Sequence, residues 1–131
     1  MNPVVHFEMP ADDKERMKKF YTEAFGWKME QYGPEMGNYT VVATTEVDEK
    51  TQMPKEPGRI NGGFFDKTEE SYRNARITVA VDNIEEGIKK VEEAGGKVKG
   101  HPVEIPHVGK YVEFTDTEGN QLSLLQPSPM G

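Results

Sequence analysis

The sequence predicts an α+β fold, in which two tandem βαβββ modules form a curved antiparallel sheet around a central cleft. The first observation is an internal repeat, because residues 75–102 resemble residues 5–32 at an offset of 70 positions. Matched positions include Glu15 and Glu85, Gly26 and Gly96, and, where the offset becomes 72, Tyr39 and Tyr111. The second observation is that strand-like and helix-like segments follow the same order in both copies. Two copies are too few for a stacked solenoid, so the repeat indicates a duplicated half-domain.

The first module starts with an alternating strand over 4–9, in which Val5, Phe7 and Met9 share one face. Asp12 and Glu15 have the spacing of a helix-capping pair. Apolar residues then recur at helical spacing until Gly26, which ends the predicted helix. Strands follow over 27–32, 39–45 and 60–65, with a turn at 33–37 and a polar loop at 46–58.

The second module repeats this order. A strand is predicted over 75–81, and a helix capped by Asp82 and Glu85 ends at Gly95 and Gly96. Three further strands are predicted over 97–103, 110–115 and 121–126, the last two joined by a hairpin turn at 116–120. The boundaries are therefore module 1 over 1–66, a linker over 67–74, module 2 over 75–127 and a loose tail over 128–131.

Each module offers one amphipathic helix to a four-stranded sheet, so one sheet face is covered and the other needs a partner or a ligand. Two uncovered faces can enclose a shared cleft. Concave, partly apolar clefts are the usual sites for small molecules. We therefore expect a small-molecule ligand.

Composition excludes several classes of function. The chain has 131 residues, in the range of one domain, and no cysteine, which rules out disulfides, zinc–thiolate sites and cysteine nucleophiles. A net charge of -7 would repel a polyanion, so no nucleic-acid partner is expected. The first charge comes too early for a signal peptide, and no apolar run approaches the roughly 20 residues that span a bilayer. We expect a cytoplasmic protein with no membrane partner.

Several motifs resemble the glyoxalase / bleomycin-resistance / extradiol-dioxygenase superfamily, also called vicinal oxygen chelate proteins. They cover nearly the whole chain in the family's order: His6-Phe7-Glu8, Phe20-Tyr21, Phe25-Gly26-Trp27, Val81-Asp82-Asn83-Ile84, Ala94-Gly95-Gly96-Lys97-Val98, Ile105-Pro106-His107-Val108-Gly109 and Asp116-Thr117-Glu118-Gly119-Asn120. The resemblance supports the fold strongly and the function weakly, because this fold carries lyases, dioxygenases, epimerases, thiol transferases and drug-binding proteins.

The resemblance also implies where a divalent metal would bind. Metal-dependent members take one ligand from the first and the last strand of each half, and His6 matches the first of these positions. The other three fall on Arg76, on Ser123 and on Gly62 or Gly63. Arginine cannot donate a lone pair, serine is a poor ligand at neutral pH and glycine has no side chain. We therefore expect no resident cofactor, with Ni, Zn, Mn or Fe at His6 as the alternative.

A polar cluster is the expected replacement. His6 and Glu8 share one strand face, as do Arg76 and Thr78 in the second half. We expect Arg76 to bind Glu8 or an anionic ligand group, with a structural ion pair or an exposed arginine as the alternatives. Gln121 and Ser123 share a further face and are also expected to contact the ligand.

The remaining candidates are aromatic or histidine residues. Tyr39, Tyr111 and Phe65 could line a pocket with Trp27, although aromatic residues in strands are more often plain core. His107 lies in a turn that borders the cleft in relatives. It is a candidate catalytic residue with His6 and Glu8, against the alternative of an ordinary turn histidine. Gly62 and Gly63 in mid-strand indicate the close approach of another group.

Three functions stay open at this point. The first is a protein that binds a small molecule without a tightly bound metal. The second is a metal-dependent lactoylglutathione lyase-like or dioxygenase enzyme with a rearranged site. The third is an accessory domain that acts through its surface. The resemblance further implies a homodimer, formed with or without exchange of half-domains.

Overall fold

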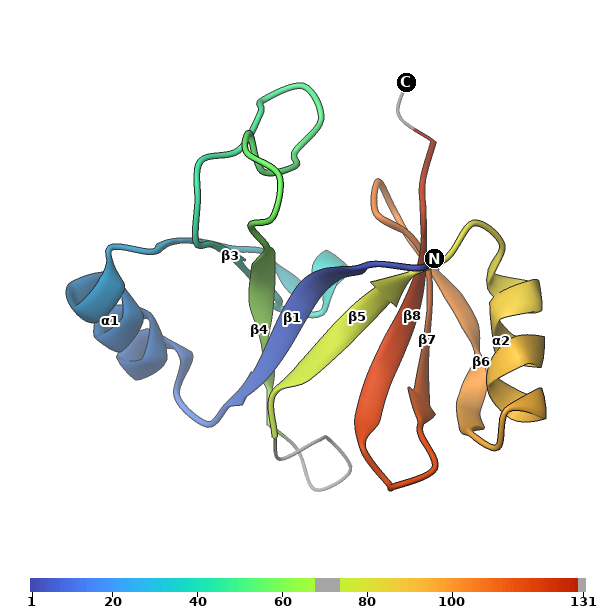
Figure 1. Ribbon diagram of the computed structural model, residues 1–131. Coiled ribbons are helices and arrows are strands. Elements are labelled where there is room, and N and C mark those ends of the chain that lie inside the picture. Colours follow the sequence, from blue (N-terminus) through green and yellow to red (C-terminus); the bar gives the residue numbers. More distant parts are fainter. Residues whose placement is uncertain (68–73, 130–131) are drawn as a thin grey trace. The chain divides into compact units, whose positions relative to one another are not determined.

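The computed structural model describes residues 1–67 and 74–129 and contains two helices and eight strands (Figure 1). The chain divides into two compact units. One consists of His6–Ala75, and the other combines Met1–Val5 with Arg76–Gly131. The α+β class and the repeated βαβββ order are confirmed. The predicted linker lies mostly outside the described residues, as does the end of the predicted tail.

The first unit contains one four-stranded sheet in the order β2-β3-β4-β1. Its elements are β1 (Val4–Ala11), α1 (Lys14–Phe25), β2 (Lys28–Gln31), β3 (Thr40–Ala43) and β4 (Asn61–Asp66), with a short 3-10 turn, η1 (Pro34–Met36). The predicted polar loop at 46–58 lies between β3 and β4 and contains one isolated bridge between Val47 and Pro54.

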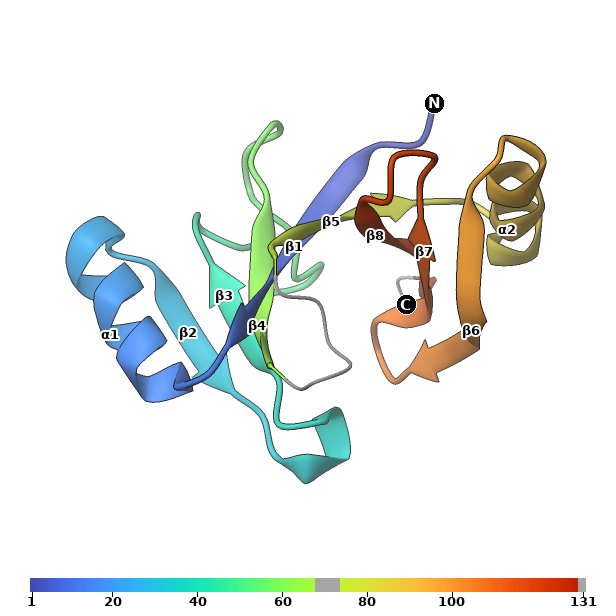
Figure 2. The ribbon, with the colours of Figure 1, turned by 90° about the horizontal axis from the view of Figure 1, so that it is seen from below.

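The second unit has the corresponding sheet in the order β5-β8-β7-β6. Its elements are β5 (Arg76–Ala80), α2 (Ile84–Glu93), β6 (Lys97–Ile105), β7 (Gly109–Thr115) and β8 (Gln121–Pro127). Helix α2 runs alongside β6 in two perpendicular views (Figures 1 and 2).

Each sheet is mixed, which corrects the expectation of purely antiparallel strands. β1 pairs with β4 in parallel, and β5 pairs with β8 in parallel, whereas the other pairs in each sheet are antiparallel. The reason is topological. The helix after the first strand makes a crossover, so the second strand points in the same direction as the first. Two reversals then leave the fourth strand parallel to the first.

Both helices start one residue later than the capping pattern predicted. The side chain of Asp13, not Asp12, accepts a hydrogen bond from the Arg16 amide. In the second unit Asn83, not Asp82, caps the Glu86 amide. The cap is set by which residue has extended backbone angles while its oxygen reaches the third amide, and both Asp13 and Asn83 meet this condition.

Gly26 ends α1 as predicted, with a φ of 73° and a hydrogen bond from its amide to the Thr22 carbonyl. The end of α2 differs. Ala94 is the capping residue there, and the following Gly95 has the positive φ. Among the described residues, neither helix is long and apolar enough to cross a membrane.

In the second unit, the two sheet faces have opposite character. One face forms the core against α2, and its buried members are Val81, Ile84, Val112, Phe114 and Leu124. Side chains alternate across a strand, so the next residue along each strand points to the other face. That face carries Arg76, Thr78, Glu113 and Ser123, with Glu113 and Thr78 both in register with Ser123.

The first unit repeats this division. Its core contains Ala11, Val42 and Phe64, packed with Met17 and Tyr21 of α1. The opposite face receives the alternate residues of β1 and β4, among them His6, Glu8, Gly63 and Phe65. Both units therefore place polar groups on the sheet face that their helix leaves uncovered.

Candidate functional site

A hydrogen-bonded cluster of His6, Glu8 and Tyr39 occupies the helix-free face of the first unit. The Tyr39 hydroxyl donates to Glu8 Oε2 at 2.9 Å and lies 3.2 Å from His6 Nε2. His6 and Glu8 are two positions apart on β1, which places both on the same face. The cluster joins two residues predicted as catalytic with one predicted to contact a ligand.

Glu8 is the buried member of this cluster, with only 5% of its surface exposed. A carboxylate removed from water is costly unless hydrogen bonds compensate for the lost hydration. The Tyr39 hydroxyl is one of the groups that provide this compensation. His6 and Tyr39 are half-buried, so the cluster runs from a buried acid to partly accessible groups.

Gly63 makes room for Tyr39. It lies beside Glu8 in the parallel β1–β4 pair, and a Cβ atom on Gly63 would overlap the Tyr39 ring and hydroxyl. Tyr39 follows a turn in which Gly37 and Asn38 both take left-handed backbone angles, with φ of 67° and 56°. The mid-strand glycines indicated a close approach, which at Gly63 is that of the Tyr39 side chain and at Gly62 that of both the backbone oxygen and the ring of Phe7.

The helix-free face of the second unit holds two polar pairs. Arg76, which is 8% exposed, forms an ion pair with Glu113 at 3.4 Å. Thr78 and Ser123 are both buried, and their hydroxyls are 2.8 Å apart. Arg76 does not point into bulk solvent, and its ion-pair partner Glu113 is not among the predicted site residues.

The other predicted site residues are distributed more widely. Phe65 and Tyr111 are half-buried on the helix-free faces of their own units, whereas Gln121 is exposed at the start of β8. His107 is exposed in the β6–β7 turn and has a φ of 66°, which is uncommon for a residue other than glycine. His107 belongs to the second unit, whereas His6 belongs to the first.

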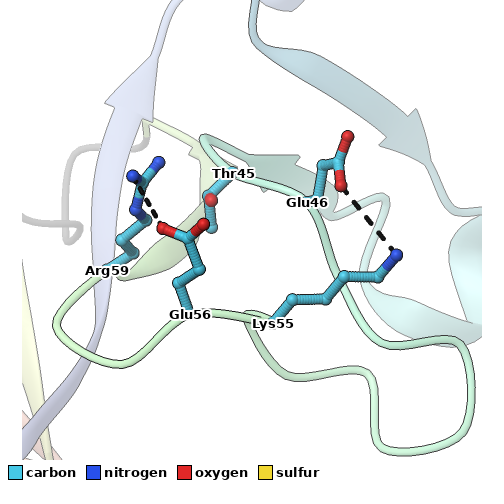
Figure 3. Close-up of a pocket in the computed structure, with 5 residues that line it drawn as sticks. All are labelled: Thr45, Glu46, Lys55, Glu56 and Arg59. Atoms are coloured by element: carbon cyan, nitrogen blue, oxygen red, sulfur yellow. Dashed lines mark ion pairs between the residues drawn. The ribbon is translucent and has the colours of Figure 1, made fainter.

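An open pocket of about 460 Å³ lies elsewhere in the first unit, over the 46–58 loop (Figure 3). Its lining residues are Thr45, Glu46, Lys55, Glu56 and Arg59. Two ion pairs cross its surface, Arg59 to Glu56 at 2.8 Å and Lys55 to Glu46 at 3.9 Å, and all four side chains are more than half exposed. The charges of this pocket are solvated and paired with each other, whereas the Glu8 carboxylate is buried, so we do not assign the site to this pocket.

Glu113 was not predicted from the sequence, and the role of Gly63 was predicted only in part. Glu113 could have been found from the strand period, because it lies two positions after Tyr111 on the same face as Ser123. Gly63 was recognised as a point of close approach, but the sequence could not show which group approaches. Its partner, Tyr39, is 24 positions away and reaches it through the β3–β4 pairing.

The comparisons with known proteins agree on the family. The sequence pattern of the Glyoxalase/Bleomycin resistance protein/Dioxygenase superfamily matches residues 4–124. A glyoxylase-like domain-containing protein of Didymella fabae is 36% identical over 117 residues, which cover 86% of this chain and 84% of that protein.

Solved structures show the same fold at low sequence identity. A hypothetical protein from Bacillus halodurans C-125 has a TM-score of 0.69 at 16% identity, covering 99% of this chain and 97% of the other. Methylmalonyl-CoA epimerase from Mycobacterium tuberculosis has a TM-score of 0.67 at 12% identity, covering 96% and 88%. The chain belongs to the Glyoxalase/Bleomycin resistance protein/Dioxygenase superfamily.

Proposed function

We propose that this chain is a small-molecule-binding member of the superfamily and that the His6–Glu8–Tyr39 cluster contacts the ligand. The supporting observation is the hydrogen-bonded cluster itself. It places a buried carboxylate, a phenol and an imidazole on a sheet face that the unit's own helix does not cover. Such convergent polar groups orient a ligand, while aromatic neighbours such as Phe65 provide apolar contact. The ligand we expect carries a hydroxyl or carbonyl oxygen.

The donor set does not fit the usual metal of the family. Within residues 1–67 and 74–129, no three His, Asp or Glu side chains gather closely enough to hold a metal ion. Of the four positions that the resemblance assigns to ligands, one carries the cation Arg76 in an ion pair, and another carries Ser123 bonded to Thr78. A third falls on Gly62 or Gly63, which have no side chain, and the space over Gly63 is filled by Tyr39. We therefore propose that the protein functions without the family's metal.

A ligand screen followed by nuclear magnetic resonance tests the proposal. Wild-type protein is titrated with a panel of small carboxylates, hydroxyketones and phenols, and the amide signals of β1, β3 and β4 are followed. Tyr39→Phe keeps the ring and removes the hydroxyl, so we expect it to weaken binding of a responding compound about two- to tenfold, as loss of one hydrogen bond implies.

Glu56→Gln in the open pocket of Figure 3 is the matched control and should leave the affinity unchanged. A compound that loses affinity in Glu56→Gln but not in Tyr39→Phe would move the site to that pocket. A panel in which nothing shifts the β1, β3 and β4 signals would contradict the proposal.

The alternative is a metal-dependent lyase or dioxygenase with a rearranged site. The name of the Didymella fabae relative supports it, because 36% identity over most of both chains often accompanies a shared chemistry. About one equivalent of bound Ni, Zn, Mn or Fe, with stabilisation when the metal is added, would favour this alternative.

We also propose that the chain forms a homodimer and works in the cytoplasm. The resemblance suggests the dimer, and the absence of cysteine fits a reducing compartment. Light scattering on the purified chain tests the dimer, because a monomer has a mass of 14.8 kDa. A mass near that value at all concentrations would contradict it.

A further inference from the structure

We propose that Tyr39 is a positioning residue that holds His6 in one tautomer, with the proton on Nε2. The inference concerns the cluster on which the proposed function rests, and it goes further by assigning the direction of each hydrogen bond. Its consequence is that the Nδ1 atom of His6 carries the lone pair.

The Tyr39 hydroxyl has a single proton to donate. Glu8 is a carboxylate and offers only acceptor oxygens, so the bond of 2.9 Å uses that proton. Toward His6 the phenol oxygen can then only accept. The contact of 3.2 Å to Nε2 therefore requires the proton to be on Nε2. Both hydrogen bonds then point toward the carboxylate: the half-buried imidazole N–H donates to the phenol oxygen, and the phenol donates to the buried Glu8.

Gly63 leaves the space that the Tyr39 side chain needs to reach Glu8 and His6. The Tyr39 hydroxyl occupies the volume where a side chain on Gly63 would start, directly beside Glu8. In the family resemblance, the second metal donor of the first module falls on Gly62 or Gly63. A phenol from the neighbouring strand β3 thus stands in place of that donor. An Nε2 atom that carries a proton has no lone pair for a metal, so the same hydrogen bond closes His6 Nε2 to coordination.

Nitrogen-15 spectra of histidine-labelled protein measure this tautomer without any ligand. The spectra are recorded at about pH 9, well above the ordinary histidine pKa of about 6.5, so that the rings are neutral. His101 and His107 are exposed and serve as internal references. His6→Gln identifies the His6 signals by their loss. We expect a higher ratio of Nε2–H to Nδ1–H forms for His6 than for the two references, because exposed neutral imidazoles also favour the Nε2–H form but have no Tyr39 oxygen to hold it.

Two substitutions separate positioning from a general structural effect. Tyr39→Phe should lower the ratio of Nε2–H to Nδ1–H forms of His6 about two- to tenfold, because one hydrogen bond is lost. Gly63→Ala should lower it as well by displacing the Tyr39 ring. Gly87→Ala is the matched control, since Gly87 belongs to the other unit and its added methyl meets Val81 and Leu124 at 3.3 to 3.4 Å, and it should leave the ratio unchanged.

An Nδ1–H form of His6 in the wild type, or an unchanged ratio in Tyr39→Phe, would overturn the inference. Either result would leave the ligand screen intact, because a ligand could still bind the cluster. Conversely, a panel without any binding compound would contradict the proposed function while the tautomer assignment stood. The two failures are therefore distinguishable.

Discussion

Arg76 is a buried cation on the helix-free face of the second unit. Its guanidinium is almost fully removed from water and is paired with Glu113. Taking away one member of a buried pair leaves an uncompensated charge, which costs more than the pair contributes in the first place. The position that the resemblance assigns to a metal ligand therefore holds a charge that the fold itself must balance.

Glu113→Ala should destabilise the fold, because it removes the partner of a buried charge. We expect a loss of about 1–3 kcal/mol in the free energy of unfolding, less than the 3–5 kcal/mol of a fully buried pair, because the Glu113 side chain is 28% exposed. Urea unfolding measures it. Glu46→Ala breaks the solvated pair with Lys55 and is the control, with an expected change close to zero. Equal losses in both variants would contradict the role of Arg76 burial.

Asp116 gives a prediction for pH. Hydrogen bonds from the Asn120 side chain, the Asn120 amide and the Glu118 amide lower the pKa of the Asp116 carboxyl below its ordinary value of 3.8. A lowered pKa in the folded state means that the ionised form stabilises the β7–β8 turn. This stabilisation is present above pH 3.8 and is lost as the pH falls through the folded pKa.

We therefore expect Asp116→Asn to be less stable than wild type at pH 7, with the difference shrinking in acid. Urea midpoints across this range check the direction. Asn120→Ala, which removes the largest cause, should raise the carboxyl pKa toward its ordinary value when followed by carbon-13 spectra. A pKa that is unchanged in Asn120→Ala would be inconsistent with this account.

At the scale of elements, sequence patterns located both α-helices and all eight strands of the described residues, but not the details that depend on backbone geometry. Both capping pairs were placed one residue early, since Asp12 and Asp13 are chemically equivalent in sequence and only the chain's extended angles select Asp13. The parallel pairing of β1 with β4 was missed for a similar reason. Alternation shows which residues share a face, whereas strand direction follows from the crossover made by α1.

The corrected caps are testable as a pair. Asn83→Ala should destabilise the second unit by about 1 kcal/mol, because the Glu86 amide loses its acceptor. Asp82→Ala, one residue earlier, should change stability by less than half as much. Thermal unfolding of both variants decides between the two positions. A larger effect at Asp82 would restore the capping pair read from the sequence.

At the scale of the whole chain, the duplication is informative both where it holds and where it fails. The repeated glycines, caps and tyrosines predicted two similar modules, and the structure contains them. The positions assigned to metal ligands break the repeat, since His6 corresponds to Arg76. From sequence we could predict that His6, Arg76 and Ser123 are polar and that the four positions together differ from the family's metal donors. The pairings of Tyr39 with Glu8 and of Arg76 with Glu113 could not be predicted, because each depends on strand register.

The central claim is that this member of the superfamily works without the family's metal. Elemental analysis of the purified wild-type chain, after incubation with Ni, Zn, Mn and Fe salts and desalting, tests it most directly. We predict less than about a tenth of an equivalent of any of these metals, since no three His, Asp or Glu side chains in the described part of the chain gather to compensate for their lost hydration. About one equivalent of one metal, lost in His6→Gln, would contradict the claim.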